Sequence, residues 1–70
     1  MHIQDSEQLG KKIREARKRS GLTQNKLAAL ADVGPRFLSE LERGKPTAQL
    51  GKALKICGLL GLEIHIHERR

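Results

Sequence analysis

Basic side chains are the most abundant chemically active groups of this sequence. Its 70 residues include 14 Lys and Arg against 8 Asp and Glu, which gives a formal net charge of +6. This excess favours a polyanionic partner, meaning DNA, RNA or an anionic membrane, and the alternative is a soluble protein that happens to be basic. Phe37 is the single aromatic residue. Because RNA and single-strand binders stack bases on aromatic side chains, the composition argues against those two classes.

Residue types that serve catalysis or metal binding are sparse. The sequence has no Ser/His/Asp set, no Gly-rich phosphate loop and no evident carboxylate pair, so we do not expect an enzyme. Cys57 is the only cysteine, which excludes an internal disulfide, and no Cys/His cluster has zinc-finger spacing. His65 and His67 share one face of an expected strand, where a dimer could use them to bind a metal; we favour a solvent-facing role. We therefore expect no metal and no cofactor.

The segment from Gly21 to Gly44 must position the basic groups, and its pattern predicts two short helices joined by a tight turn. Thr23 has the hydroxyl of a good N-cap. Asp32-Val33-Gly34 interrupts the helical pattern with residues that tolerate a sharp turn. Pro35 suits the first position of a helix. Helix, turn and helix is the layout of a DNA-binding helix-turn-helix, although periodicity alone indicates only two packed helices.

A first helix precedes this segment. Asp5 or Ser6 can cap it, and it is expected to run to about Ser20. Its apolar stripe consists of Leu9, Ile13 and Ala16. The remaining surface is strongly basic, and we interpret Lys11, Lys12 and Arg14 mainly as a solvated helix face.

A last helix follows the segment, capped by Thr47 and running to about Leu60. Its expected inward stripe consists of Leu50, Ala53, Leu54, Cys57 and Leu60. Ile56 and Leu59 lie outside that stripe. Because an exposed apolar surface usually marks a contact, we interpret this surplus as part of a subunit interface.

Residues 62–67 alternate strictly between apolar and polar types, which predicts a half-buried strand. A lone strand leaves backbone groups unpaired, and a chain of this length has a marginal core. We therefore expect the strand to pair with its own copy across a two-fold axis. The predicted dimer interface comprises Ile56, Leu59, Leu62, Ile64 and Ile66.

Three motifs carry a resemblance to a known family: IREARKRSGLTQ at 13–24, Leu27-Ala28, and LSELERGK at 38–45. With them, residues 7–61 resemble the Cro/repressor-type helix-turn-helix family, also called XRE. The run RFLSELERGKPT is most similar to HipB-like antitoxin regulators. The resemblance implies a single, mainly α domain over residues 1–70, with four to five helices within 6–60. A strand at 62–67 would pair across a homodimer, as in that subgroup.

The resemblance implies that Pro35–Arg43 is a recognition helix lying in the major groove. Arg36 is the strongest candidate for base readout, because its planar fork can bond guanine O6 and N7 together; a phosphate contact is the alternative. Phe37 could meet a thymine methyl or pack on the side of the helix that precedes the turn. Ser39 could bond a base or a phosphate. Glu40 could accept from a cytosine amine or simply be solvated.

Other positions are expected to hold the DNA backbone. The candidates for phosphate contact are Thr23, Gln24, Asn25, Arg43 and Lys45, with Lys18 or Arg19 as possible helpers. Gln24 matches a family position that bonds phosphate, and the free N–H groups beside it attract an anion. Arg17 and Glu42 match a family ion pair that joins the first helix to the end of the recognition helix. This pair would fix the docking angle rather than contribute much stability.

The implied function is a repressor that binds double-stranded DNA as a homodimer. Two recognition helices about 34 Å apart, or a multiple of it, require an inverted-repeat operator. HipB-like proteins also hold a HipA-like kinase toxin, so the resemblance implies a toxin partner. A stand-alone phage-type or housekeeping repressor is the alternative. The sequence shows no signal peptide and no long apolar run, which predicts a cytoplasmic protein without membrane contact.

Overall fold

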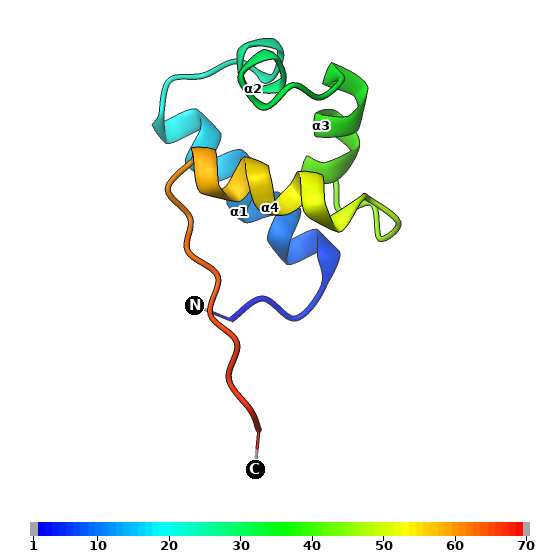
Figure 1. Ribbon diagram of the computed structural model, residues 1–70, viewed down its shortest axis with the longest axis vertical. Helices are drawn as coiled ribbons and strands as arrows, with labels where there is room; N and C mark the ends of the chain where they lie inside the picture. The colour runs from blue at the N-terminus through cyan, green and yellow to red at the C-terminus, as the bar shows by residue number, and fades with distance from the viewer. Residues whose placement is uncertain (1, 70) are drawn as a thin grey trace.

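Four helices form the part of the chain that the computed structural model describes, residues 2–69 (Figure 1). They are α1 (Ser6–Arg19), α2 (Gln24–Ala31), α3 (Pro35–Glu42) and α4 (Leu50–Leu59). The first helix packs against α3, and α2 packs against both α3 and α4. The mainly α architecture expected from the sequence is confirmed. No helix within residues 2–69 is both long and apolar enough to cross a membrane.

The starts of α1 and α2 follow the expected capping chemistry. Asp5 Oδ1 accepts a hydrogen bond from the backbone N–H of Gln8 at 2.8 Å. Thr23 Oγ1 accepts one from the N–H of Lys26 at 3.1 Å. Each oxygen satisfies a backbone donor that the first turn of a helix leaves free, so both N-cap predictions are confirmed.

The turn between α2 and α3 is tight because one residue adopts a left-handed conformation. Asp32 ends α2 at φ 56°, a region that Asp tolerates better than most residues. Val33 N–H then bonds back to Ala28 O at 3.0 Å. Gly34 precedes α3 without a side-chain cap, and Pro35 occupies the first turn, where its missing N–H costs no helical bond. The chain thus reverses sharply and exposes one face of α3.

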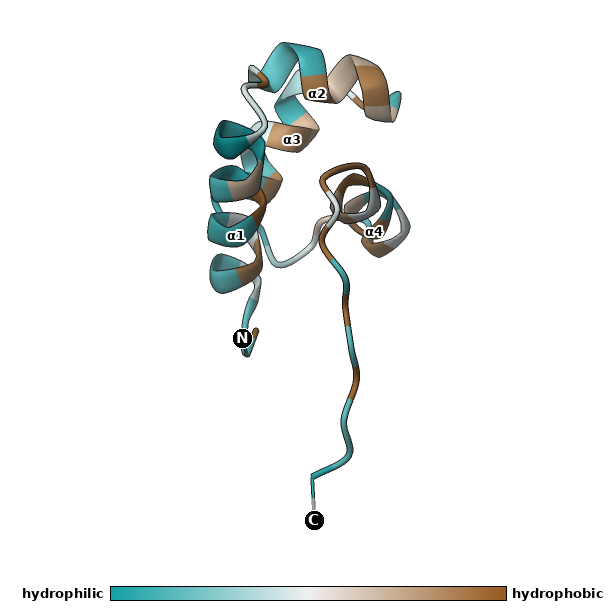
Figure 2. Cartoon of the chain, turned by 90° about the vertical axis from the view of Figure 1, so that its left-hand side faces the viewer, coloured by the Kyte–Doolittle hydropathy of each residue, from teal (hydrophilic) through white to brown (hydrophobic). Residues whose placement is uncertain are grey.

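The core lies between the four helices, whose apolar faces turn toward one another (Figure 2). Its buried members are Ile13, Ala16, Leu27, Ala28, Ala31, Leu38, Leu41, Ala53, Ile56 and Cys57. This set is small, as expected for a chain of 70 residues.

Gly10 allows α1 and α3 to approach very closely. A Cβ atom at this position would overlap the Leu41 carbonyl oxygen and lie 2.7 Å from that of Glu42. No side chain larger than hydrogen fits between the two backbones there. The contact fixes α1 against the C-terminal end of α3, next to the side chains of the candidate site.

The last helix differs from the sequence-based prediction in its start and in its buried face. It begins at Leu50 with Gln49 as N-cap, whereas Thr47 lies in the preceding turn, so the Thr47 cap is wrong. Leu50 and Leu54 are 67% and 46% exposed. Ile56 is fully buried in the core of the chain, so its assignment to a dimer interface is also wrong. Apolar residues surround most of this helix, and their periodicity therefore could not select the inward side.

Residues 62–69 leave α4 as an extended tail (Figure 1). Leu62 is half-buried against the core, while Ile64 is about half exposed and Ile66 is 92% exposed. The tail pairs with no other strand within residues 2–69. Its pairing with a second subunit stays a prediction.

Candidate nucleic-acid interface

A buried ion pair joins α1 to the end of α3. Arg17 Nε donates to Glu42 Oε2 at 2.6 Å, and Arg17 Nη2 donates to Glu42 Oε1 at 3.1 Å. Only 8% of Arg17 and 7% of Glu42 is exposed. Arg17 Nη1 also donates to the Leu22 carbonyl at 2.8 Å, so the guanidinium is bonded on three sides. This is the two-point geometry in which an arginine fixes the orientation of a carboxylate.

Gln24 extends the pair to the start of α2. Its Nε2 donates to Glu42 Oε1 at 3.0 Å. A side-chain amide nitrogen carries two hydrogens, so one remains for an external acceptor. Glu42 thereby orients the side chain that the family resemblance assigned to phosphate. The network links three helices, and every buried side-chain polar atom within residues 2–69 has a partner.

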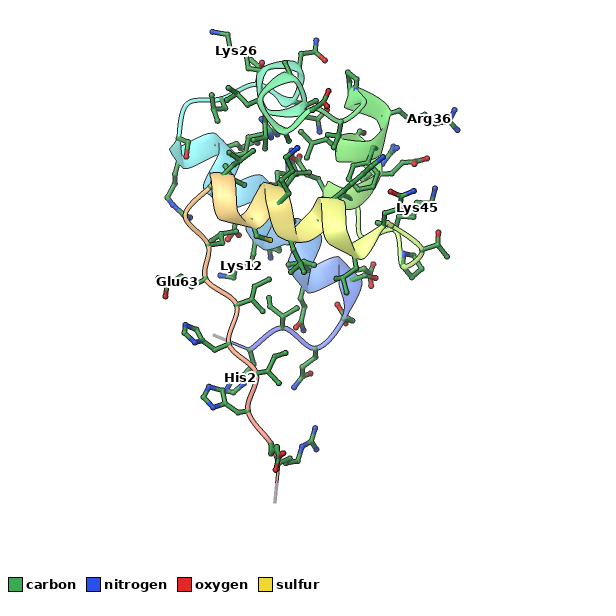
Figure 3. The ribbon with its side chains drawn as sticks, in the orientation of Figure 1. His2, Lys12, Lys26, Arg36, Lys45 and Glu63 are labelled. Carbon is green, nitrogen blue, oxygen red and sulfur yellow. The ribbon has the colours of Figure 1, made fainter. Side chains whose placement is uncertain are left out.

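Three polar side chains at helical spacing line the outer face of α3: Arg36, Ser39 and Arg43, the last of which caps the helix. Arg36 has 91% of its side chain accessible, and it points away from the helices (Figure 3). Lys45 lies in the loop just beyond α3. This outer face therefore presents a basic stripe of the kind that enters a DNA groove.

Glu40 stands between two of these cations. Lys45 Nζ donates to Glu40 Oε1 at 3.1 Å, and Arg36 Nε lies 3.5 Å from Glu40 Oε2. The hydrogen bond from Lys45 is the main cause that lowers the pKa of Glu40, followed by the charges of Lys45 and Arg36. The carboxylate is therefore ionised at neutral pH and engaged on both oxygens, which weakens the case for cytosine readout by Glu40.

Arg36 approaches Glu40 through Nε, and 91% of its side chain stays accessible, so its two Nη groups remain available to a partner. Those two groups form the planar fork that can bond guanine O6 and N7. No hydrogen bond within residues 2–69 uses them. The side chain is thus partly oriented by the protein while its recognition end stays open.

Phe37 lies on the other side of α3, half-buried against the core. Lys52 Nζ of α4 sits 5.5 Å from the centroid of its ring, within range of a cation–π interaction. Of the two interpretations left open for Phe37, packing is supported by this geometry, and a thymine contact is not.

The remaining expected phosphate residues lie at the surface. All of them are exposed: Thr23, Asn25, Arg43 and Lys45. The Thr23 hydroxyl is already engaged as an N-cap.

Arg14 was not among the residues that the sequence indicated for DNA contact. It lines an open hollow together with Gln24, Ser39 and Arg43. Its spacing of three residues from Arg17 was the available signal, because residues three apart share a helix face.

The residues expected at the dimer interface, other than Ile56, are at or near the surface. Leu59, Ile64 and Ile66 are exposed and Leu62 is half-buried. Leu50 and Leu54 add to this apolar surface. Within residues 2–69 of one chain, no three His, Cys, Asp or Glu side chains lie close enough together to hold a metal ion. His65 Nε2 instead lies 3.3 Å from Glu63 Oε1.

Two helices joined by a short turn, with the second helix exposing one face, form the layout of the helix-turn-helix class. The family model HTH_3, described as "Helix-turn-helix", matches residues 13–66, and the chain belongs to this family. It is 48% identical over 58 residues to a protein of Sinorhizobium fredii (strain NBRC 101917 / NGR234) described as "Uncharacterized HTH-type transcriptional regulator y4mF". That match covers 83% of this chain and 76% of the relative.

Solved structures of HipB share the fold. The chain in "HipB-O4 20mer complex" matches with a TM-score of 0.87 at 23% identity, covering 100% of this chain and 99% of that one. The chain in "Structure of HipA-HipB-O2-O3 complex" gives the same TM-score, identity and coverage. At this identity the likeness establishes the fold. Together with the HTH_3 match, it confirms the expected resemblance to the XRE type and to HipB.

Proposed function

We propose that this protein is a transcriptional repressor that binds double-stranded DNA sequence-specifically as a homodimer. The observation that carries the proposal is the exposed basic stripe of α3, held in place by the Arg17–Glu42–Gln24 network. In this proposal α3 lies in the major groove, where Arg36 reads a guanine. The net charge of +6 supports backbone contacts on either side. The relative named as a transcriptional regulator supports the same class.

Phosphate contacts would come from the surface around α3. Gln24 keeps a free N–H beside the start of α2, and Asn25, Arg43 and Lys45 are exposed on the same region of the chain. Thr23 contributes its backbone N–H rather than its hydroxyl, which is already an N-cap. Such contacts fix the orientation of the protein on the duplex, and they carry no sequence information directly.

Dimerisation is supported by apolar surface that the single chain leaves exposed. Leu50, Leu54 and Leu59 of α4 lie outward, and Ile64 and Ile66 extend along the tail. Exposed apolar residues concentrated on one helix and the adjacent segment indicate a contact surface. A symmetric dimer would pair the two tails as strands and present two α3 helices to an inverted repeat.

We further propose that the protein is the antitoxin of a HipBA-like pair and binds a kinase-like toxin in the cytoplasm. The run RFLSELERGKPT and the fold shared with HipB in its complex with HipA support this step. The alternative is a stand-alone repressor. Co-expression of the tagged chain with a kinase-like protein encoded beside it tests the point, since a stable complex favours the antitoxin and separate elution favours the alternative.

Footprinting of the DNA upstream of its own gene tests the repressor proposal. We expect protection of two symmetry-related half-sites, with a complex whose mass in analytical ultracentrifugation corresponds to two chains per duplex. The proposal is wrong if no defined half-site is protected even at protein concentrations at which the chain already binds a scrambled duplex nonspecifically.

A further inference from the structure

The hollow beside α3 has a composition that suits an anionic oxygen group. It encloses about 310 Å³ where three helices meet. Its lining consists of Arg14 and Arg17 from α1, Gln24 from α2, and Ser39, Glu42 and Arg43 from the end of α3. All six side chains are polar, and five of them, all except Glu42, carry hydrogen-bond donors. Two of these donors, Arg14 and Arg43, are exposed to solvent.

The charges of the hollow leave a net excess of two positive groups. Arg17 and Glu42 neutralise each other, because they are paired at 2.6 Å and both are buried. Arg14 and Arg43 are exposed at the rim, and neither makes a salt bridge with a described residue. Gln24 keeps one N–H for an external acceptor. Nothing in the hollow offers an unpaired negative charge.

We propose that this hollow is a seat for one DNA backbone phosphate, in which Arg14 and Arg43 hold the phosphate oxygens from two sides. This inference rests on the proposed DNA-binding function and adds Arg14 to its contacts. The second N–H of Gln24 and the hydroxyl of Ser39 complete the donor set. Arg and amide groups are the usual phosphate ligands in such interfaces.

The seat also separates the roles of side chains along α3. Ser39 and Arg43 face the hollow, whereas Arg36 lies beyond it and does not line it. The phosphate would therefore lie beside the C-terminal half of α3, and base readout would belong to the N-terminal half. Of the two interpretations left open for Ser39, this placement selects the phosphate contact.

Salt-dependent binding of Arg14→Gln measures the proposed contact. The matched control is Lys11→Gln, which removes one exposed positive charge from the same helix, one turn away and outside the hollow. Each variant is titrated with the footprinted operator duplex and with a scrambled duplex. Arg14→Gln should weaken binding to both duplexes on the order of threefold to tenfold, and lower the slope of log K against log salt by about 0.9 per protomer. Lys11→Gln should change the slope much less.

Two further measurements identify a true seat. Arg14→Lys keeps the charge and should restore most of the slope. Replacing single phosphates by neutral methylphosphonates should reveal one position per half-site that weakens the wild type clearly more than Arg14→Gln, because the variant keeps Arg43, Gln24 and Ser39 but has already lost one of its contacts to that phosphate. Equal effects of Arg14→Gln and Lys11→Gln, or loss on the operator alone, would overturn the seat. A wild type that binds both duplexes equally well would instead contradict sequence specificity, while the slope comparison would still test the seat.

Discussion

At the scale of single residues, we expect the buried pair of Arg17 and Glu42 to matter more for positioning other side chains than for stability. Bringing two charges out of water costs free energy that their attraction only partly offsets, so such a pair contributes little net stability. Its position matters more, because Glu42 also holds the amide of Gln24. In the proposed interface, the pair would therefore set the position of the Gln24 phosphate contact relative to α3.

Substitutions at this pair should distinguish the two roles. Arg17→Ala leaves Glu42 buried without its partner, and we expect a loss of about 3–5 kcal/mol in the free energy of unfolding. Replacing both residues by Leu should recover most of that stability in thermal melts, because no charge is then buried. DNA affinity should not recover, since Gln24 has lost its acceptor. Wild-type operator binding by the double variant would contradict the positioning role.

Substitutions at Arg36 and Glu40 test the sequence specificity of DNA binding. Arg36→Ala should relax discrimination at one base-pair position by about 1–3 kcal/mol. Glu40→Gln should weaken the same preference, because it removes the carboxylate that faces Nε of Arg36 and leaves the fold unchanged. The measurement is selection from an operator library randomised at each position. A preference lost at a different base pair in Glu40→Gln would mean that Glu40 reads DNA by itself.

At the scale of elements, Gly10 shows how tightly α1 and α3 are fitted. Gly10→Ala places a methyl group against the carbonyls of Leu41 and Glu42, so we expect a loss of about 2 kcal/mol in stability, the usual cost of overpacking. The matched control is Gly51→Ala in α4, where an added Cβ atom would have no neighbouring atom within 4 Å. That change should be neutral or stabilise by up to about 1 kcal/mol. Equal melting temperatures for the two variants would argue against the close contact.

The elements also show what the sequence could and could not predict. The caps at Asp5 and Thr23 and the turn at Asp32 follow from local chemistry, and the structure confirms them. The buried face of α4 does not, because apolar residues occupy most of its circumference. In the folded chain α4 packs against α2, with Ile56 buried and Leu50 exposed. Tertiary contacts, and not the local sequence, therefore determine which face of α4 is buried.

The candidate site was predictable to a similar extent. Residues that match the family motif, such as Arg17 and Glu42, are found paired as expected. The hydrogen bond from Gln24 to Glu42 and the position of Arg14 depend on how three helices meet, which no single stretch of sequence encodes. Sequence spacing indicated which residues share a face of α1 and of α3, and only the fold brought those faces together.

At the scale of the whole molecule, the tail and α4 leave apolar surface that one chain does not cover. Ile66 is almost fully exposed, so its replacement by Glu should not destabilise an isolated chain. In the proposed dimer the same charge would enter the paired strands. We therefore expect Ile66→Glu to convert dimers to monomers in analytical ultracentrifugation and to weaken operator binding at least tenfold, because the second half-site no longer adds to affinity.

Leu30→Glu provides the control for that experiment. Leu30 is also an exposed apolar residue, at 63%, but it lies on α2, away from the tail. The same charge placed there should leave the mass of the assembly unchanged. A wild-type chain that sediments as a folded monomer, or two variants with identical mass distributions, would contradict pairing through the tail. The inverted-repeat operator would then lose its structural basis, whereas the contacts of each single α3 helix with DNA would not.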